Sequence, residues 1–345
     1  MTVPRGYFDR TPQFELGLSE NPFPPLPSVL AALNDVMANA NRYPEFLPDR
    51  LPRVIARRIG AHPDQIIVGS GATGVAMQTL QAVFGASVFR GTEESRGERS
   101  RMVFAAPTFD GYPIMASIVG VDAVAVPLDS AGRQNLSAMA AAVDDRTGVV
   151  VVCRPHNPTG TLIGAAEFEA FLRAIPEDVV VILDEAYVEF VRTQDTLDTL
   201  GMIRKHPNLL ILRTFSKAFG LAGLRIGYAF GAPTLTSRIR RWQLPFGVNS
   251  TAVAAVTASY AAEHELHLRV ARITAEREHL RNALQQRGIR VPRSHANFLY
   301  LSGHGIAGAL EQAGIVVKSY PDGSARIAVG DPAASRAVLR ALASA

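Results

Sequence analysis

The feature that most constrains the fold is a series of short, uninterrupted apolar runs between about residues 28 and 231, separated mainly by segments with helical periodicity. The runs predict strands over residues 65–69, 101–106, 121–126, 148–153, 179–184, 208–213 and 225–230. Strands that are apolar on both faces are typical of a mostly parallel sheet covered by helices on both sides. This region is therefore predicted to be an α/β domain.

Helical segments and one polar loop connect these runs. The expected crossover helices cover residues 109–119, 136–143 and 165–175. Nearer the N-terminus, Ser28 is expected to cap a helix over residues 29–40, and Asp49 is expected to cap the next helix. The charged, glycine-containing segment 91–101 predicts an exposed loop.

The pattern changes after residue 233. A basic helix, a segment of small residues, a long polar helix and short strands alternating with helices follow. Single hydrophobic cores stop growing at roughly 250–300 residues, so a chain of 345 residues is expected to contain two domains. We predict an N-terminal arm over residues 1–27 that joins the small domain, a large α/β domain over 28–233, and a small α+β domain over 234–345.

Composition argues against several classes of function. The formal net charge is +4, but the arginines are spread along the chain without a basic block, which disfavours nucleic-acid binding. The single cysteine, Cys153, cannot form an intrachain disulfide, and the N-terminus lacks the apolar segment of a secretory signal. The longest uncharged stretch, 242–262, contains Pro245 and Gly247, which disfavours a membrane span. We expect a cytoplasmic protein that binds no metal, nucleic acid or membrane.

The chain has only three lysines, and one of them lies where α/β sheets bind ligands. Lys217 sits between a predicted strand and a glycine-punctuated loop, whereas Lys205 is expected on the surface. Thr214 and Ser216 offer hydroxyl groups beside Lys217, and Arg225 follows at the far end of the loop. Hydroxyl groups, backbone amides and an arginine suit a bound phosphate.

Two other predicted strands are also followed by polar side chains. Asp184 ends the run 179–184, where it is either a helix cap, a structural ion-pair partner, or a carboxylate that keeps a pyridine nitrogen protonated. Tyr187 follows Asp184 and could direct its hydroxyl into the same cleft. Asn157 either forms an ordinary turn with Pro158 or donates a hydrogen bond to a ligand oxygen.

The glycine-rich turn GSGATG, residues 69–74, lies between a predicted strand and a predicted helix. Backbone amides at a helix N-terminus can bind a phosphate, although this turn matches neither the P-loop nor the dinucleotide-binding motif. A phosphate cradle, an amide, a carboxylate, a phenol, an amine and a guanidinium thus occur at successive strand ends. This set predicts a phosphorylated aromatic cofactor bound through an imine.

Several motifs carry a family resemblance over essentially the whole chain. The most specific is RTFSKAFGLAGLRIGYA, residues 213–229. The others are SENPFP (19–24), NRYPE (41–45), GSGATG, PTFDGYP (107–113), HNPTG (156–160), DEAYVEF (184–190), ANFLYL and ARIAVG. With these motifs the chain resembles the pyridoxal-phosphate aminotransferases of the aspartate aminotransferase fold, in the branch of histidinol-phosphate and actinobacterial aromatic amino acid aminotransferases.

The resemblance implies roles around a pyridoxal 5'-phosphate cofactor. Lys217 would bind the cofactor as an imine and carry the proton between substrate and cofactor. Asp184 would pair with the protonated pyridine nitrogen, and Asn157 and Tyr187 would hydrogen-bond the phenolic oxygen. Phe109 would stack on the ring. The residues expected to hold the phosphate are Ala72, Thr73, Thr214, Ser216 and Arg225.

The resemblance also implies how the active site is completed. Tyr43 of a partner subunit would reach the phosphate, which implies a homodimer with shared active sites. Arg326 would bind the substrate carboxylate through two parallel hydrogen bonds. Asn21 and Lys318 are the other expected substrate contacts.

The expected reaction moves an amino group from an aromatic amino acid to a 2-oxo acid such as 2-oxoglutarate. Segment LPFGVNS, residues 244–250, resembles the aromatic subgroup, whereas Lys318 and Ser19 stand where the family usually has arginine and histidinol-phosphate enzymes usually have asparagine. The dipeptide Arg154-Pro155 also replaces the usual Asn-Pro. The alternatives are a histidinol-phosphate aminotransferase and a pyridoxal-phosphate decarboxylase of the same fold.

Overall fold

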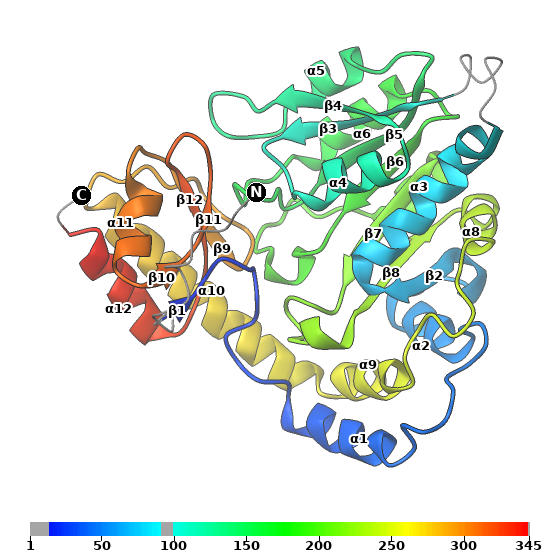
Figure 1. Ribbon diagram of the computed structural model, residues 1–345, viewed down its shortest axis with the longest axis horizontal. Helices are drawn as coiled ribbons and strands as arrows, with labels where there is room; N and C mark the ends of the chain where they lie inside the picture. Colours follow the sequence, from blue (N-terminus) through cyan, green and yellow to red (C-terminus); the bar gives the residue numbers. More distant parts are fainter. Residues whose placement is uncertain (1–13, 91–98, 344–345) are drawn as a thin grey trace.

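The computed structural model describes residues 14–90 and 99–343. A seven-stranded sheet with the order β2-β8-β7-β6-β5-β3-β4 forms the centre of its larger part (Figure 1). Its strands are β2 (Ile66–Ser70), β3 (Arg101–Ala106), β4 (Asp122–Pro127), β5 (Thr147–Cys153), β6 (Val180–Asp184), β7 (Leu209–Thr214) and β8 (Ile226–Gly231). Each predicted strand is confirmed, and each predicted end lies within about one residue of the observed end.

One strand of this sheet departs from the parallel pattern. The pairs β3–β4, β3–β5, β5–β6 and β6–β7 are parallel, whereas β8 is antiparallel to both β2 and β7. A parallel pair needs a long crossover, usually a helix, but only residues 215–225 connect β7 to β8. The loop that contains Lys217 is therefore a short return between two adjacent antiparallel strands.

Helices cover both faces of the sheet, as the continuous apolar strands predict. Along β6, Val181 and Leu183 belong to one apolar cluster, while Val180 and Ile182 belong to the cluster on the opposite face. The first cluster receives α1 (Pro27–Met37), α2 (Arg50–Ile59), α5 (Leu136–Ala141), α6 (Ala165–Ala174), α7 (Thr199–Lys205) and α9 (Thr251–Ala261). The second receives α3 (Gly71–Arg90), α4 (Gly111–Ile118) and α8 (Pro233–Arg240).

The starts of the first two helices differ from their predicted caps. The prediction that Ser28 caps α1 is wrong, because the helix already begins at Pro27 and its cap position is Leu26. Proline is favoured at the first helical position, so it moves the start one residue upstream of Ser28. Asp49 does occupy the cap position of α2, but its carboxylate makes no cap hydrogen bond and pairs with Arg53 at 2.9 Å.

A smaller part of the chain carries a three-stranded antiparallel sheet with the order β11-β12-β9. Its strands are β9 (Phe298–Leu301), β11 (Lys318–Ser319) and β12 (Ala325–Ala328). The helices around it are α10 (Glu263–Gln285), α11 (Ile306–Gln312) and α12 (Pro332–Ala341). The long helix α10 runs from beneath the large sheet to this smaller part (Figure 1).

The segment 314–320 does not form a single strand. Its first half, β10 (Ile315–Val316), pairs in parallel with β1 (Phe14–Glu15), and its second half, β11, pairs with β12. The N-terminal segment thereby packs on the smaller part of the chain. Short 3₁₀ helices complete the described structure, namely η1 (Pro63–Gln65), η3 (Val188–Phe190) and η4 (Ala222–Leu224).

The long uncharged stretch 242–262 and the polar segment 91–101 are the remaining segments whose structure was predicted from the sequence. Within the long uncharged stretch, only Thr251–Ala261 is helical, and no helix in the described ranges is long and apolar enough to cross a membrane. Most of the expected exposed loop, residues 91–98, lies outside the described residues.

Candidate active site

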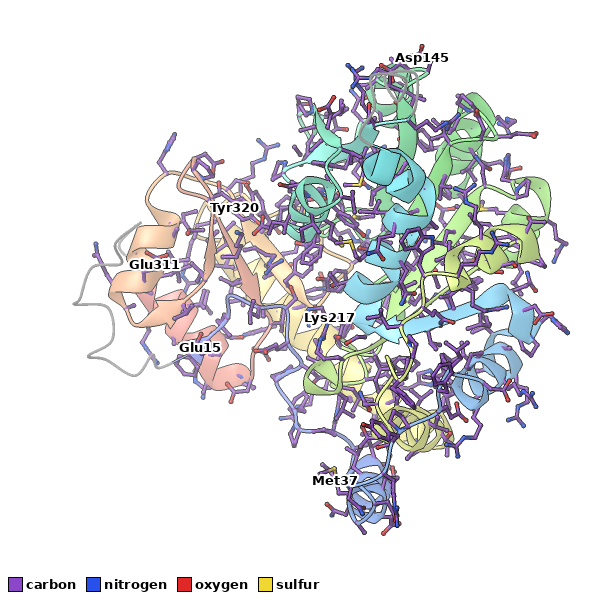
Figure 2. All side chains as sticks on the ribbon, turned by 45° about the vertical axis from the view of Figure 1, so that its right-hand side comes forward. Glu15, Met37, Asp145, Lys217, Glu311 and Tyr320 are labelled. Carbon is purple, nitrogen blue, oxygen red and sulfur yellow. The ribbon has the colours of Figure 1, made fainter. Side chains whose placement is uncertain are left out.

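A cavity of about 490 Å³ lies at the carboxyl ends of the parallel strands, between the seven-stranded sheet and the smaller part of the chain. Lys217 lies where the two parts meet, while Tyr320 lies on the smaller part (Figure 2). The predicted site residues that line the cavity are Ala72, Thr73, Phe109, Asn157, Asp184, Tyr187, Thr214, Ser216, Lys217, Arg225, Lys318 and Arg326. Asn21 and Tyr43 are the two predicted site residues that do not line it.

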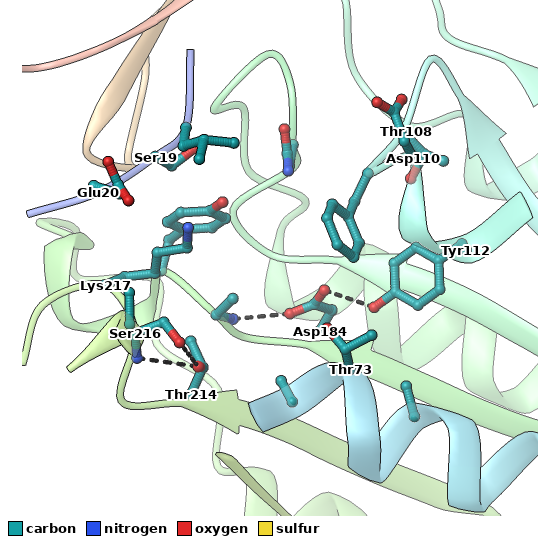
Figure 3. Close-up of a pocket in the computed structure, with 18 of the residues that line it drawn as sticks. Ser19, Glu20, Thr73, Thr108, Asp110, Tyr112, Asp184, Thr214, Ser216 and Lys217 are labelled. Atoms are coloured by element: carbon teal, nitrogen blue, oxygen red, sulfur yellow. Dashed lines mark hydrogen bonds between the residues drawn. The ribbon is translucent and has the colours of Figure 1, made fainter. Parts of the chain in front are cut away.

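Lys217 projects into this cavity from the loop between β7 and β8 (Figure 3). Burial is the larger cause and the positive charge of Arg326 the next, and together they lower the pKa of Lys217 to about 8. An amine with this pKa is partly neutral near neutral pH, so it can act as a nucleophile or as a base. Lys205, by contrast, is exposed and pairs with Glu169 at 3.0 Å, as expected for a surface lysine.

The backbone around Lys217 is held by the N-terminal segment. The Asn21 side-chain amide donates hydrogen bonds to the carbonyl oxygens of Lys217 at 3.2 Å and of Ala218 at 2.9 Å. The Gly220 amide also donates to the Lys217 carbonyl, at 3.1 Å, and Gly220 has a positive φ of 70°. Asn21 therefore positions the lysine loop in this structure, whereas a substrate contact was expected.

Asp184 ends β6 on the floor of the cavity. Its Oδ2 accepts a hydrogen bond of 2.6 Å from the Tyr112 hydroxyl, and its Oδ1 accepts one of 2.9 Å from the Ala186 amide (Figure 3). Burial raises the pKa of Asp184, while these hydrogen bonds lower it. Within the described residues Asp184 neither forms an ion pair nor caps a helix, so neither structural role accounts for it.

An anion cradle lies at the N-terminus of α3. Ala72 and Thr73 stand in its first turn, and the Arg225 guanidinium donates to the Ser216 hydroxyl at 3.4 Å. The Thr214 hydroxyl donates to Ser216 at 3.0 Å. A helix N-terminus presents unpaired amides, and together with a guanidinium and two hydroxyls it suits a phosphate.

Glycines allow the close approach of chain segments in this cradle. A Cβ on Gly71 would lie 2.3 Å from a guanidinium nitrogen of Arg225, and Gly71 has a φ of 76°. A Cβ on Gly227 would lie 2.1 Å from the Ala72 amide nitrogen. Larger residues at either position would displace the arginine or the helix start.

A second group of polar side chains lies opposite the lysine. Arg326 in β12 is buried and donates to the Asn157 side-chain oxygen and to the Gly17 carbonyl, both at 2.7 Å. Within residues 14–90 and 99–343, Arg326 has no carboxylate partner. Burial raises the pKa of the neighbouring Tyr187 to about 12. The cavity thus presents a guanidinium that a substrate carboxylate can approach.

Two aromatic side chains differ in their relation to the cavity. Phe109 forms part of its wall and stands edge-on to Tyr112, with ring centroids 5.7 Å apart. Tyr43 is 83% exposed and packs against Phe246, with ring centroids 4.7 Å apart. Tyr43 therefore projects from the surface, and Phe46 beside it is also exposed.

Several residues that line the cavity were not predicted from the sequence. Tyr112, which hydrogen-bonds Asp184, lies within the PTFDGYP motif, so the motif was a usable signal. Asp110 belongs to the same motif, and Glu20 belongs to SENPFP. Tyr320 directly follows β11, and no sequence motif indicated that it would line the cavity.

The chain is similar in sequence to known proteins over almost its whole length. Residues 11–342 match the family described as "Aminotransferase class I and II". The aromatic amino acid aminotransferase of Streptomyces avermitilis is 39% identical over 331 residues, which cover 95% of this chain and 89% of the relative. That of Thermobifida fusca is 41% identical over 322 residues, which cover 92% and 86%.

Solved structures share the same architecture. A histidinol-phosphate aminotransferase from Sinorhizobium meliloti, in complex with pyridoxal-5'-phosphate, gives a TM-score of 0.86 at 26% identity and covers 96% of this chain and 90% of its own. The aspartate aminotransferase from Thermus thermophilus with maleate gives 0.79 at 20% identity, with the same shares of 96% and 90%. The predicted fold class is therefore confirmed.

Proposed function

Because the chain belongs to the class I and II aminotransferases, we propose that it transfers the amino group of an aromatic amino acid to a 2-oxo acid such as 2-oxoglutarate. The observation that carries this substrate class is the 39–41% identity to aromatic amino acid aminotransferases over more than nine-tenths of the chain. The enzyme depends on pyridoxal 5'-phosphate, as members of this family do.

The donor set of the cavity fits this cofactor. The cradle of Ala72, Thr73, Ser216 and Arg225 suits its phosphate, and the Asp184 carboxylate suits its pyridine nitrogen. Burial raises the pKa of Asp184, and the hydrogen bond from Tyr112 acts in the opposite direction by favouring the ionised form. When bound, pyridoxal phosphate supplies an electron sink for bond breaking at the substrate α-carbon.

Lys217 is proposed as the group that holds the cofactor aldehyde and that moves the substrate proton. Its lowered pKa, about 8, keeps part of its amine unprotonated at neutral pH. A base works best when its pKa lies near the operating pH. The Asn21 side chain holds the backbone of the lysine loop by hydrogen bonds to the carbonyl oxygens of Lys217 and Ala218, so the Lys217 amine keeps its position in the cavity.

The substrate contacts are proposed on the opposite side of the cavity. Arg326 would bind the α-carboxylate, since its guanidinium faces the cavity without a carboxylate partner among the described residues. Phe109 and Tyr320 line the space beside it and offer apolar contact to an aromatic side chain. Asn157 holds Arg326 in place through a hydrogen bond of 2.7 Å.

We also propose that the active form is a homodimer. Tyr43, Phe46 and Phe246 form an exposed aromatic cluster. Exposed apolar patches of this kind mark interaction sites, and Tyr43 would contribute its hydroxyl to the phosphate site of the partner. Analytical ultracentrifugation of wild type and Tyr43→Asp checks this, with a shift toward monomer expected for the variant.

The reaction is tested by mixing holoenzyme with single amino donors and following the absorbance of the bound cofactor. Phenylalanine and tyrosine are expected to change the spectrum, and 2-oxoglutarate is expected to restore it. A change with histidinol phosphate alone would replace the aromatic assignment. Release of carbon dioxide without amino transfer would select a decarboxylase instead.

A further inference from the structure

One ion pair of the cavity belongs to none of the roles above. Lys318 in β11 pairs through Nζ with Asp110 Oδ2, and Asp110 directly precedes α4 on the seven-stranded sheet. Both residues line the cavity. The pair therefore connects the two parts of the chain across the space where substrates would bind.

Lys318 is also a direct neighbour of the proposed carboxylate-binding arginine. In the antiparallel pairing of β11 with β12, Lys318 lies opposite Arg326. Residues opposite each other in such a pair project from the same face, and like charges there repel. Asp110 offsets one of these two charges, while Arg326 has only neutral acceptors among the described residues, namely the Asn157 amide oxygen and the Gly17 carbonyl.

Asp110 is available for this task because its carboxylate makes no hydrogen bond to the start of its own helix. It occupies the cap position of α4, yet its side chain accepts no cap hydrogen bond. The Asp110 and Lys318 side chains are 59% and 36% exposed. Ion pairs this exposed are weak, so another carboxylate can exchange with Asp110 at little cost.

We propose that Asp110 is a specificity-determining counter-ion that occupies Lys318 until a second substrate carboxylate replaces it. The inference rests on the proposed function, in which one cavity must accept an aromatic amino acid and a dicarboxylic 2-oxo acid in turn. When an aromatic substrate is bound, Lys318 stays paired with Asp110, so no unpaired ammonium group faces the aromatic ring of the substrate. The distal carboxylate of a dicarboxylic acid takes Lys318, whose flexible stem and point charge tolerate a change of partner.

The test compares Michaelis constants for phenylalanine and 2-oxoglutarate in variants of the holoenzyme. The measured quantity is the ratio of KM for 2-oxoglutarate to KM for phenylalanine. Asp110→Asn removes the competing carboxylate and is expected to lower this ratio up to about fivefold. Lys318→Met removes the cation and is expected to raise it at least about tenfold, while Lys318→Arg keeps the ratio closer to wild type.

A second exposed lysine–carboxylate pair supplies the matched control. Lys205 and Glu169 form an ion pair of 3.0 Å outside the cavity, so Lys205→Met and Glu169→Gln make the same chemical changes there. Both control variants are expected to leave the ratio within about twofold of wild type. Thermal unfolding of every variant reports whether the fold is retained.

Three outcomes would overturn the inference. The first is an unchanged ratio in both Asp110→Asn and Lys318→Met, and the second is a higher ratio in Asp110→Asn. The third is a wild-type enzyme that transfers amino groups from phenylalanine to pyruvate but not to 2-oxoglutarate. The proposed function would survive all three, because it fails only if no aromatic amino acid donates its amino group.

Discussion

The two walls of the cavity differ in how firmly their side chains are held. On the seven-stranded sheet, Asp184 accepts hydrogen bonds of 2.6 and 2.9 Å from Tyr112 and the Ala186 amide. On the three-stranded sheet, Arg326 is buried and held by hydrogen bonds of 2.7 Å, but the partly exposed Lys318 is held only by its ion pair with Asp110 among the described residues. Removing a partner from an enclosed polar group costs about 1–3 kcal/mol or more, whereas an exposed ion pair contributes about 0–1 kcal/mol. We call the Asp184 side of the cavity the firm wall and the Lys318 side the loose wall. The groups proposed for the chemistry lie on the firm wall, and on the loose wall a small change in free energy is enough to change the partner of Lys318.

The largest effect is expected at the lysine on the firm wall. Lys217→Ala removes the amine that carries the proton, so kcat is expected to fall by at least about 10³-fold. Lys205→Ala removes an exposed lysine that pairs with Glu169 and serves as the matched control. Steady-state assays with phenylalanine and 2-oxoglutarate check both. A Lys217→Ala enzyme that keeps a tenth of wild-type turnover would show that another group is the base.

A buried ion pair next to Asp184 tests the firmness of the large sheet itself. Glu185 is 1% exposed and accepts hydrogen bonds of 2.9 and 2.8 Å from the Arg213 guanidinium. Glu185→Gln removes the carboxylate that pairs with Arg213, whose side chain is 19% exposed, so the free energy of unfolding is expected to fall by up to about 3–5 kcal/mol, the cost for a fully buried pair. Urea unfolding of the apoprotein measures this.

The control for that experiment is Glu169→Gln, which breaks an ion pair at the surface. Its urea midpoint is expected to stay at the wild-type value, because solvent screens exposed charges. A Glu185→Gln protein as stable as Glu169→Gln would mean that water reaches the Arg213 site and that the large sheet is not the firmer region.

The Tyr112 hydroxyl tests the firm wall at the cofactor site. Tyr112→Phe removes one of the two hydrogen bonds to Asp184. Hydrogen bonds to charged groups contribute about 1.5–3 kcal/mol, so the affinity for pyridoxal phosphate is expected to fall about tenfold or more. Equilibrium dialysis measures it, with Tyr260→Phe as a control because Tyr260 does not line the cavity. Equal affinities in the two variants would contradict the role of Tyr112.

The polar side chains of the firm wall were predicted from the apolar strands beside them, whereas Arg326 and Lys318 were expected as substrate contacts from the family resemblance. Lys217 and Asn157 follow continuous apolar strands and Asp184 ends one, and the carboxyl ends of neighbouring parallel strands meet at one edge. Local pattern was therefore sufficient to bring these side chains together. The same reasoning failed at Ser28, where the adjacent Pro27 begins the helix first.

The remaining contacts depend on pairings that local pattern does not encode. Tyr112 and Asp184 are separated by 72 positions, and Lys318 and Asp110 by 208. The antiparallel direction of β8 likewise depends on the short connection from β7, because strand composition alone does not distinguish the two directions. Side-chain contacts between residues far apart in the sequence can be assigned only when the relative positions of the two sheets are known.

The pKa of Lys217 gives a pH prediction with a defined sign. Only the neutral amine attacks an aldehyde, so the rate at which apoprotein takes up pyridoxal phosphate is expected to rise with pH and to level off above about pH 8. Between pH 6 and 7 the rate should increase about tenfold, since the neutral fraction grows tenfold per unit below the pKa. An ordinary lysine with a pKa of 10.5 would still show a rising rate at pH 10.

Arg326 offers the control for this titration. Its positive charge lowers the pKa of Lys217 after the larger effect of burial, so Arg326→Met is expected to move the midpoint upward. Stopped-flow absorbance on mixing apoprotein with pyridoxal phosphate measures both midpoints. Comparing two proteins with the same reagent cancels the titration of the cofactor itself. A midpoint that moves downward in Arg326→Met would contradict the proximity of the two charges.

The smallest effect on stability is expected for Asp110→Asn, on the side of the cavity that carries Lys318. Asp110→Asn and Glu185→Gln each convert one ion-paired carboxylate to an amide, and the two sites differ in side-chain exposure, 59% against 1%. Asp110→Asn is therefore expected to change the free energy of unfolding by about 0–1 kcal/mol, measured in the same urea titrations. If Asp110→Asn destabilises the protein as much as Glu185→Gln, the Lys318 wall is held as firmly as the cofactor wall. Substrate choice would then have to depend on groups other than this exchangeable pair.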